Sequence, residues 1–324
     1  MKVKIIRNLT AIVVVTAIFS TSLNAQERND VIKAYNEGAK LIQTDIQAAI
    51  TAFENVVTLA DKVGETANDL KQKAVQVLPG LYVKVAANTV SQKKTGPEIV
   101  KAAKAALAAA GKYENATAKE NAGRLLVQAY TITGTQLFTK KDYENALLVF
   151  DSLLMISPDY AAAYYNKALV YRNQNNAGAF EETIDLYLEK LKSANDTVRA
   201  KQASSLALEY FRASGSLANQ AEKLEEAAVL LNKAAKYGDD KDLFYYFADV
   251  YNKQKNFDGG AEFAQKGLNL ETGNAEAKAK FYYQLAVAQA GKGDNAKACE
   301  SFKNSLYGPF AAASKAQRTN LKCP

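Results

Sequence analysis

The chain has 324 residues, of which 48% are hydrophobic and 23% charged, a balance typical of an ordered protein rather than a disordered one. It contains no histidine, which excludes histidine-dependent acid–base and nucleophilic catalysis and removes the commonest metal ligand. Its 41 lysines and arginines exceed its 34 acidic residues, but a formal net charge of +7 over this length is too weak to indicate nucleic-acid binding.

Residues 1–25 have the three-part pattern of a secretory signal. MKVKIIRN is a basic start, LTAIVVVTAIF is an apolar run, and STSLNA is a polar end with Ala25 at the expected cut. The apolar run is shorter than the roughly 20 residues of a membrane helix, and no cysteine lies near the cut to carry a lipid. We therefore expect a cleaved signal peptide, a periplasmic or secreted protein, and no membrane span. Cleavage of the signal would lower the number of lysines and arginines from 41 to 38 and leave the 34 acidic residues unchanged. The mature chain would then have a net charge of +4.

Residues 26–120 are predicted to form degenerate helical hairpins. AYNEGAKL followed by QAAITAFENVV places large and small residues at helical spacing, namely Tyr35, Gly38, Ala49 and Phe53. The next segment is helical in composition but contains Pro79 and Gly80, which predict a kink or a break. A further helix is predicted from Thr95, because Thr95 and Glu98 have the spacing of a capping box.

The clearest helical pattern is KKDYENALLVFDSLLMISPDY, residues 140–160. Steps of three and four residues place one apolar face on a single helix, made by Tyr143, Ala146, Phe150 and Leu153. Asp142 is in the place of an N-cap, and Pro158 is where the helix must stop. Just upstream, Tyr130, Gly134 and Leu137 have the same spacing. Because Gly134 and Ala146 are small, the two helices can approach closely, and the segment predicts a helical hairpin.

This hairpin resembles the tetratricopeptide repeat, a 34-residue unit. With Val127 as the first position, the family's large, small and proline positions are filled by Tyr130, Gly134, Leu137, Ala146, Phe150 and Pro158. Thr133 replaces a usual leucine. The pattern returns from Ala161, Ala200, Asp242 and Phe281, with about three extra residues in NNAGAF and a longer insertion around ASGSLANQ. The resemblance implies an all-α, right-handed α-solenoid, with repeats over residues 121–307.

Residues 308–324 are predicted to form a C-terminal capping helix. Phe310, Ala313 and Leu321 would share a face that covers the apolar end of the last repeat. The chain has two cysteines, Cys299 and Cys323, and an exported protein meets an oxidising compartment. We therefore expect a disulfide between them; two free thiols are the alternative.

No motif in the sequence indicates an enzyme. Phosphate-binding and dinucleotide-binding glycine patterns are absent. SQKKTG, residues 91–96, contains the SxxK and KTG motifs of penicillin-binding enzymes, but both share Lys94 and no SDN motif accompanies them. We interpret this segment as a helix end and a loop. The sequence therefore predicts no catalytic residue, no metal site and no cofactor.

Two short strings resemble a three-residue O-glycosylation signal of some Gram-negative envelope proteins. They are centred on Thr197, in an expected loop, and on Ser152, inside a predicted helix. Because a residue in a loop is more accessible than one inside a packed helix, our hypothesis favours Thr197 over Ser152 as the glycosylated residue.

The resemblance also implies a concave groove lined by the first helix of each repeat. Carried over position by position, it predicts a partner-binding set of Tyr165, Asn166, Arg172, Tyr245, Asp249 and Tyr283. The places where a carboxylate clamp would have its lysine and asparagine are filled by Thr131 and Thr135, so that mode of binding is not expected. Two functions stay open. One is an envelope scaffold that holds a partner protein or peptide; the other is a protein that binds glycan or peptidoglycan through its tyrosines, although tryptophan is absent.

Overall fold

The computed structural model describes residues 26–324, and the expected signal, residues 1–25, lies outside them. Within the described range every regular element is an α-helix or a short 3-10 helix, as the sequence predicts. None of these helices combines the length and apolar character that crossing a membrane requires. The chain divides into two compact units between Asp159 and Tyr160, inside the range predicted to hold the repeats.

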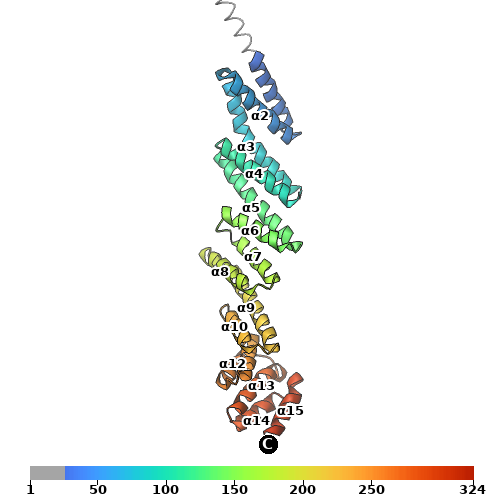
Figure 1. Cartoon of the computed structure of the whole chain (residues 1–324), viewed down its shortest axis with the longest axis vertical. Coiled ribbons are helices and arrows are strands. Elements are labelled where there is room, and N and C mark those ends of the chain that lie inside the picture. The colour runs from blue at the N-terminus through green and yellow to red at the C-terminus, as the bar shows by residue number, and fades with distance from the viewer. Residues whose placement is uncertain (1–25) are drawn as a thin grey trace, which may run out of the picture. The chain divides into compact units, whose positions relative to one another are not determined.

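In the first unit, a helix over residues 26–41 precedes helices that each pack against the next (Figure 1). They are α2 (Ile46–Val63), the 3-10 helix η1 (Glu65–Ala67), α3 (Asn68–Ser91), α4 (Gly96–Lys112), α5 (Ala116–Thr139) and α6 (Tyr143–Ile156). A core of Val31, Phe53, Leu78 and their neighbours joins the first three α-helices. In the hairpin predicted from Gly38 and Phe53, the backbone of Gly38 lies against the ring of Phe53.

The second unit continues the same pattern of helical hairpins. Its elements are α7 (Ala161–Asn173), α8 (Ala177–Ser193), α9 (Thr197–Gln220), α10 (Leu224–Ala235), α11 (Lys241–Lys253), α12 (Phe257–Leu270), α13 (Ala275–Gly291), α14 (Asn295–Asn304), η2 (Gly308–Phe310) and α15 (Ala311–Asn320). Besides these consecutive pairs, α11 contacts both α9 and α13, so the first helices of three successive hairpins lie side by side. A core that includes Phe180, Phe211, Leu231 and Phe247 runs from α7 to α11.

A single type of turn connects most of the helices. One residue of the turn has a positive φ, which ends the preceding helix; these residues are Lys93, Glu114, Lys141, Asn175, Asn195, Glu222, Lys255 and Gly293. In six of the turns the next residue caps the following helix by accepting a hydrogen bond from its first turn: Asn115, Asp142, Asn176, Asp196, Asn256 and Asp294. The predicted cap at Asp142 is therefore confirmed.

Gly134 shows why the hairpin of α5 and α6 needs a small residue. A Cβ added at Gly134 would lie 2.4 Å from Cε1 of Phe150, closer than any real contact allows. Phe150 and Ala146 are both fully buried in this interface. The absence of a side chain at Gly134 therefore sets the distance between the two helices.

Of the kink or break predicted at Pro79 and Gly80, the break does not occur. Helix α3 continues through both residues. Leu78, Pro79 and Leu81 are buried, and α3 packs against α2, α4 and α5. Tertiary packing thus offsets the backbone hydrogen bond that proline cannot make.

The two predicted insertions are wrong as well. The turn after α7 has the same length as the turn before α6, and Phe180 simply occupies the place that Ala146 holds in the α5–α6 hairpin. The segment ASGSLANQ lies inside α9. There a Cβ on Gly215 would lie 2.8 Å from Cδ2 of Leu231, the counterpart of the Gly134–Phe150 contact. The repeat is therefore in frame from Leu208 rather than Ala200, and α9 begins earlier than a standard first helix.

The C-terminal segment covers the last hairpin, as expected. Leu321 packs with Ala286, Ala298 and Phe302. Cys299 and Cys323 form a disulfide, with their Cα atoms 5.5 Å apart. One detail of the prediction is wrong: Ala313 is exposed, and the next residue, Ser314, is buried instead, where its hydroxyl meets that of Ser305 at 2.7 Å.

Candidate functional site

Three of the predicted groove residues lie on α7. Tyr165, Asn166 and Arg172 are all half-buried. The ring of Tyr165 packs against that of Tyr187 on α8, with centroids 5.2 Å apart. Part of the Tyr165 side chain therefore stabilises its own hairpin.

The other two predicted tyrosines are covered by the C-terminal segment. The ring of Phe310 lies 6.4 Å from that of Tyr245 and 5.4 Å from that of Tyr283. Burial and the nearby Asp249 carboxylate raise the pKa of Tyr245 to about 12, although a hydrogen bond with Gln284 opposes the shift. The pKa of Tyr283 is also raised, by burial and by Asp249. At this end of the chain, the predicted groove is filled by the protein's own aromatic side chains.

Asp249 is engaged by neighbouring helices. One of its oxygens accepts a hydrogen bond from Nδ2 of Asn219 on α9 at 2.6 Å, and the other accepts from Nε2 of Gln284 on α13 at 2.8 Å. Asn252, one turn further along α11, donates to the side chain and backbone of Gln284. The polar groups of this face thus connect three successive first helices, and each oxygen of the Asp249 carboxylate already has a partner.

An open hollow of about 440 Å³ lies along α5, lined by Thr131, Ile132, Thr135, Gln136, Thr139 and Lys140. Thr131 and Thr135 are at groove-facing positions of the repeat. The hydroxyls of Thr131, Thr135 and Thr139 each donate to a carbonyl one turn earlier in α5, at 2.8 to 2.9 Å. The three threonine hydroxyls of this wall are therefore already satisfied by their own helix.

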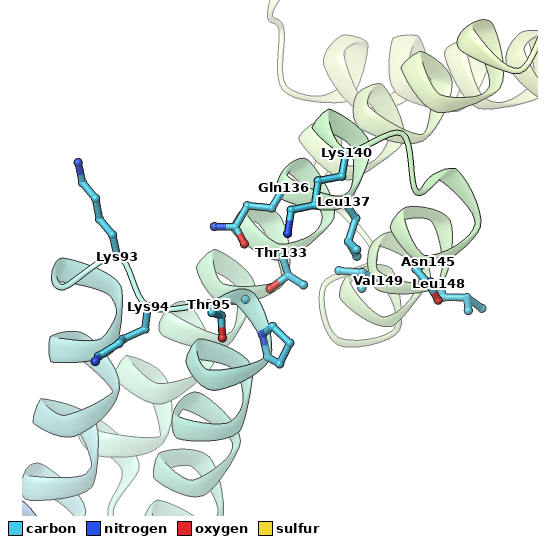
Figure 2. A pocket seen from close by; sticks show the side chains of 12 residues that line it. Lys93, Lys94, Thr95, Thr133, Gln136, Leu137, Lys140, Asn145, Leu148 and Val149 are labelled. Atoms are coloured by element: carbon cyan, nitrogen blue, oxygen red, sulfur yellow. The ribbon is translucent and has the colours of Figure 1, made fainter.

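A larger pocket of about 690 Å³ adjoins this hollow and shares Gln136 and Lys140 with it. Its walls come from the turn between α3 and α4, from α5 and from α6 (Figure 2). The lining is Lys93, Lys94, Thr95, Gly96, Pro97, Thr133, Gln136, Leu137, Lys140, Asn145, Leu148 and Val149. Figure 2 shows the Gln136 amide and the Lys140 side chain beside the hollow, while the side chains of Lys93 and Lys94 start at its rim and point away from Thr133 and Leu137. No acidic residue is among the lining residues.

A capping box fixes the wall at the start of α4. The Glu98 carboxylate accepts hydrogen bonds from the backbone amide of Thr95 at 3.0 Å and from its hydroxyl at 2.6 Å. These bonds, with a smaller contribution from Lys94, hold the pKa of Glu98 below its usual range. The predicted capping box is therefore confirmed. SQKKTG is a helix end and a loop, as interpreted, but it is also one wall of the pocket.

Sequence reasoning missed this pocket because its lining comes from segments that are far apart in the chain. Lys93 and Lys94 precede a helix cap, and Lys140 follows a repeat helix, positions that are usually solvated surface. Thr133 gave one clue. It departs from the repeat pattern, and in the structure it is buried with its side chain against Gly96. Within residues 26–324, no group of acidic or cysteine side chains is arranged to hold a metal ion.

Comparison with protein-family models and with curated proteins gave no match. Solved structures of tetratricopeptide-repeat proteins are similar to the chain at low identity. YrrB, titled a TPR protein with an unusual peptide-binding site, is 19% identical and covers 58% of this chain and 91% of its own, with a TM-score of 0.35. MamA is 17% identical, over 61% of this chain and 96% of its own, with a TM-score of 0.34. A tetratricopeptide-repeat protein from Parabacteroides merdae is 17% identical, over 92% and 99%, with a TM-score of 0.30.

These superpositions are loose, so the repeat type is assigned from contacts within this chain. The Gly134–Phe150 and Gly215–Leu231 contacts recur at the same sequence separation, and the hairpins share one turn geometry. In its fold, the chain is therefore an all-α protein built from helical hairpins of the tetratricopeptide type.

Proposed function

We propose that the chain is an exported, non-catalytic scaffold that holds a partner protein or an extended peptide. The observation that carries this proposal is the open hollow on α5, where the groove-facing Thr131 and Thr135 are not covered by the rest of the first unit. Its hydroxyls are bonded internally, so the wall offers methyl groups to apolar side chains of a ligand. Tyr165, Asn166 and Arg172 on α7 stay candidates for further contacts.

Export is part of the proposal and has its own test. We expect the protein isolated from an envelope fraction to begin near Gln26, because Ala25 ends the signal pattern. N-terminal sequencing of that protein decides the matter. An intact Met1 in a cytoplasmic fraction would contradict export and leave only the binding part of the proposal.

A photo-crosslinking amino acid at Thr135 tests the groove in intact cells. Thr51 on α2 is a matched control, because it is also exposed and its hydroxyl also donates to the carbonyl one turn earlier. We expect discrete protein adducts from Thr135 and none of the same size from Thr51. Equal adducts from both positions would contradict a groove on α5.

Glycan binding remains the second candidate. The observation in its favour is the half-buried Tyr165 on α7, whose ring can offer its exposed part to a sugar. Tyr245 and Tyr283 favour it less, because Phe310 covers them. Co-sedimentation of the purified protein with isolated peptidoglycan, lost in Tyr165→Ala, would support this second function over the first.

A further inference from the structure

The larger pocket beside α5 combines two chemical features that point to one class of ligand. Leu137, Val149 and Pro97 form an aliphatic wall, and Leu148, at 60% exposure, extends it toward solvent. Around this wall are three lysines, from the turn after α3 and from the end of α5. Its lining lacks the groove-facing Thr131 and Thr135, so the pocket is distinct from the open hollow along α5, although the two adjoin and share Gln136 and Lys140.

No acidic group within residues 26–324 forms an ion pair with these lysines, although Lys94 acts on Glu98 at longer range and helps to lower its pKa. Among the described residues, neither Lys93, Lys94 nor Lys140 forms an ion pair. The carboxylates closest in sequence have other partners: Glu98 is bound by Thr95, and Asp142 accepts from the side chain of Asn145 at 2.9 and 3.0 Å. The three ammonium groups are therefore available to an anionic ligand, and their long side chains can turn toward it.

We propose that this pocket binds an acidic segment of a partner protein. An aliphatic side chain of that segment packs between Pro97, Leu137 and Val149, and its flanking Asp or Glu carboxylates meet the three lysines. The pocket volume of about 690 Å³ is within the range for a small ligand or a few peptide residues. The inference rests on the proposed scaffold function and adds the chemistry of the partner.

The lining favours a peptide over an anionic glycan or a lipid headgroup. Sugar rings bind best on aromatic faces, and no aromatic residue lines this pocket. A headgroup alone would leave the aliphatic wall in water. A leucine flanked by carboxylates satisfies both features, since it removes apolar surface from water and pairs the charges at the rim.

Fluorescence anisotropy with short labelled peptides tests the proposal on the purified full-length mature protein. The probe is GELELG, and its matched controls are GQLQLG, which lacks the charges, and GESESG, which lacks the leucines. We expect GELELG to bind, both controls to bind at least about tenfold more weakly, and added salt to weaken the binding of GELELG.

Protein variants test whether GELELG binds in the pocket. Each exposed ion pair contributes about two- to fivefold in affinity, so Lys93→Gln, Lys94→Gln and Lys140→Gln together should weaken GELELG by about tenfold or more. The control is Lys62→Gln, Lys84→Gln and Lys101→Gln, which removes the same charge from helix positions outside the pocket. Leu148→Ser should also weaken GELELG, and since Leu148 is exposed, folding should be unaffected.

Three results would overturn the proposal. They are equal binding of GELELG and GQLQLG, equal loss in the two triple-lysine variants, and lysine-dependent binding of heparin or phosphatidylglycerol vesicles without binding of GELELG. Crosslinking at Thr135 reports on the separate hollow. Adducts at Thr135 without binding of GELELG would refute only the proposal of an acidic ligand in the pocket. Binding of GELELG without adducts at Thr135 would refute the proposal of a partner-binding groove on α5.

Discussion

At the scale of single residues, the closest contact in the repeats sets the strongest constraint. Gly134→Ala would place a Cβ 2.4 Å from the Phe150 ring, so we expect it to lower the free energy of unfolding by about 1–3 kcal/mol. Gly123, on the same helix, has open space where a Cβ would be added, and Gly123→Ala should raise stability by up to about 1 kcal/mol. Urea unfolding of both variants measures the difference. Similar effects of the two changes would contradict close packing at Gly134.

Tyr245 gives a prediction in alkaline solution. Its pKa is about 12 in the folded protein, against an ordinary value of about 10. Below pH 10 the tyrosine is protonated in both states, and its contribution to stability is complete. Between about pH 10 and pH 12 the unfolded chain loses the proton first, so the free energy of unfolding falls as pH rises.

Comparing the wild type with Tyr245→Phe isolates this contribution. We expect stability to fall less steeply in the variant over that pH range, as followed by urea midpoints, because phenylalanine has no proton to lose. Identical slopes would mean that Tyr245 is not buried beneath Phe310.

At the scale of elements, the hydrogen bonds of Asp249 hold three helices together. Asp249→Ala removes the acceptor for Asn219 and Gln284, and we expect a loss of about 1–3 kcal/mol. Asp258→Ala is the control, because the Asp258 side chain is 84% exposed and pairs only with Lys292, so its loss should be below about 1 kcal/mol. Thermal unfolding of both variants measures the effect. Equal losses would contradict a bridging role for Asp249.

A second prediction at the scale of elements concerns the effect of the disulfide on the C-terminal helix α15. The bond joins residues separated by 24 positions, and a loop of this size is worth roughly 3 kcal/mol. Reduction should let α15 separate from α14, so trypsin should cut at Lys315 or Lys322 faster than elsewhere. Mass spectrometry of the early fragments, with and without reductant, checks this. An unchanged cleavage order would show that packing and hydrogen bonds hold the helix without the disulfide.

The accuracy of sequence prediction also varied at the level of elements. Helix caps were predicted well where one residue type determines the geometry, as at Asp142 and Thr95. The predictions failed where packing outweighs local preference. Pro79 is held in α3 by buried neighbours, and Phe180 takes a place where the pattern expects a small residue. The register at Leu208 was missed because α9 begins well before the first position of its repeat.

The candidate site was harder to predict than the fold. The repeat pattern identifies groove-facing positions but does not show which of them the chain itself fills. Phe310 covers Tyr245 and Tyr283 from outside the repeats, and two amides bind Asp249. The lysine-lined pocket depends on three elements meeting in space, and nothing in the spacing of the lysines indicates it.

At the scale of the whole molecule, the division after Asp159 predicts two folding units. Each has its own apolar core, one around Phe53 and Leu78 and the other around Phe211 and Phe247. Fragments 26–159 and 160–324, produced separately, should each be helical and unfold cooperatively in circular dichroism. Their summed spectrum should match that of the mature protein. A fragment that stays unfolded would show that its core depends on the other unit.

The turns have a consequence for engineering. Seven of them place a lysine, glutamate or asparagine in the left-handed region where glycine is the least strained residue, and only the turn before α14 has glycine there. The backbone strain is local to these residues, which are exposed and recur at the same place in each turn. All of these residues except Lys93 lie outside the lysine-lined pocket. Thermal tolerance of the protein can therefore be adjusted turn by turn, in small increments, without altering either its core or the surfaces proposed to bind a partner.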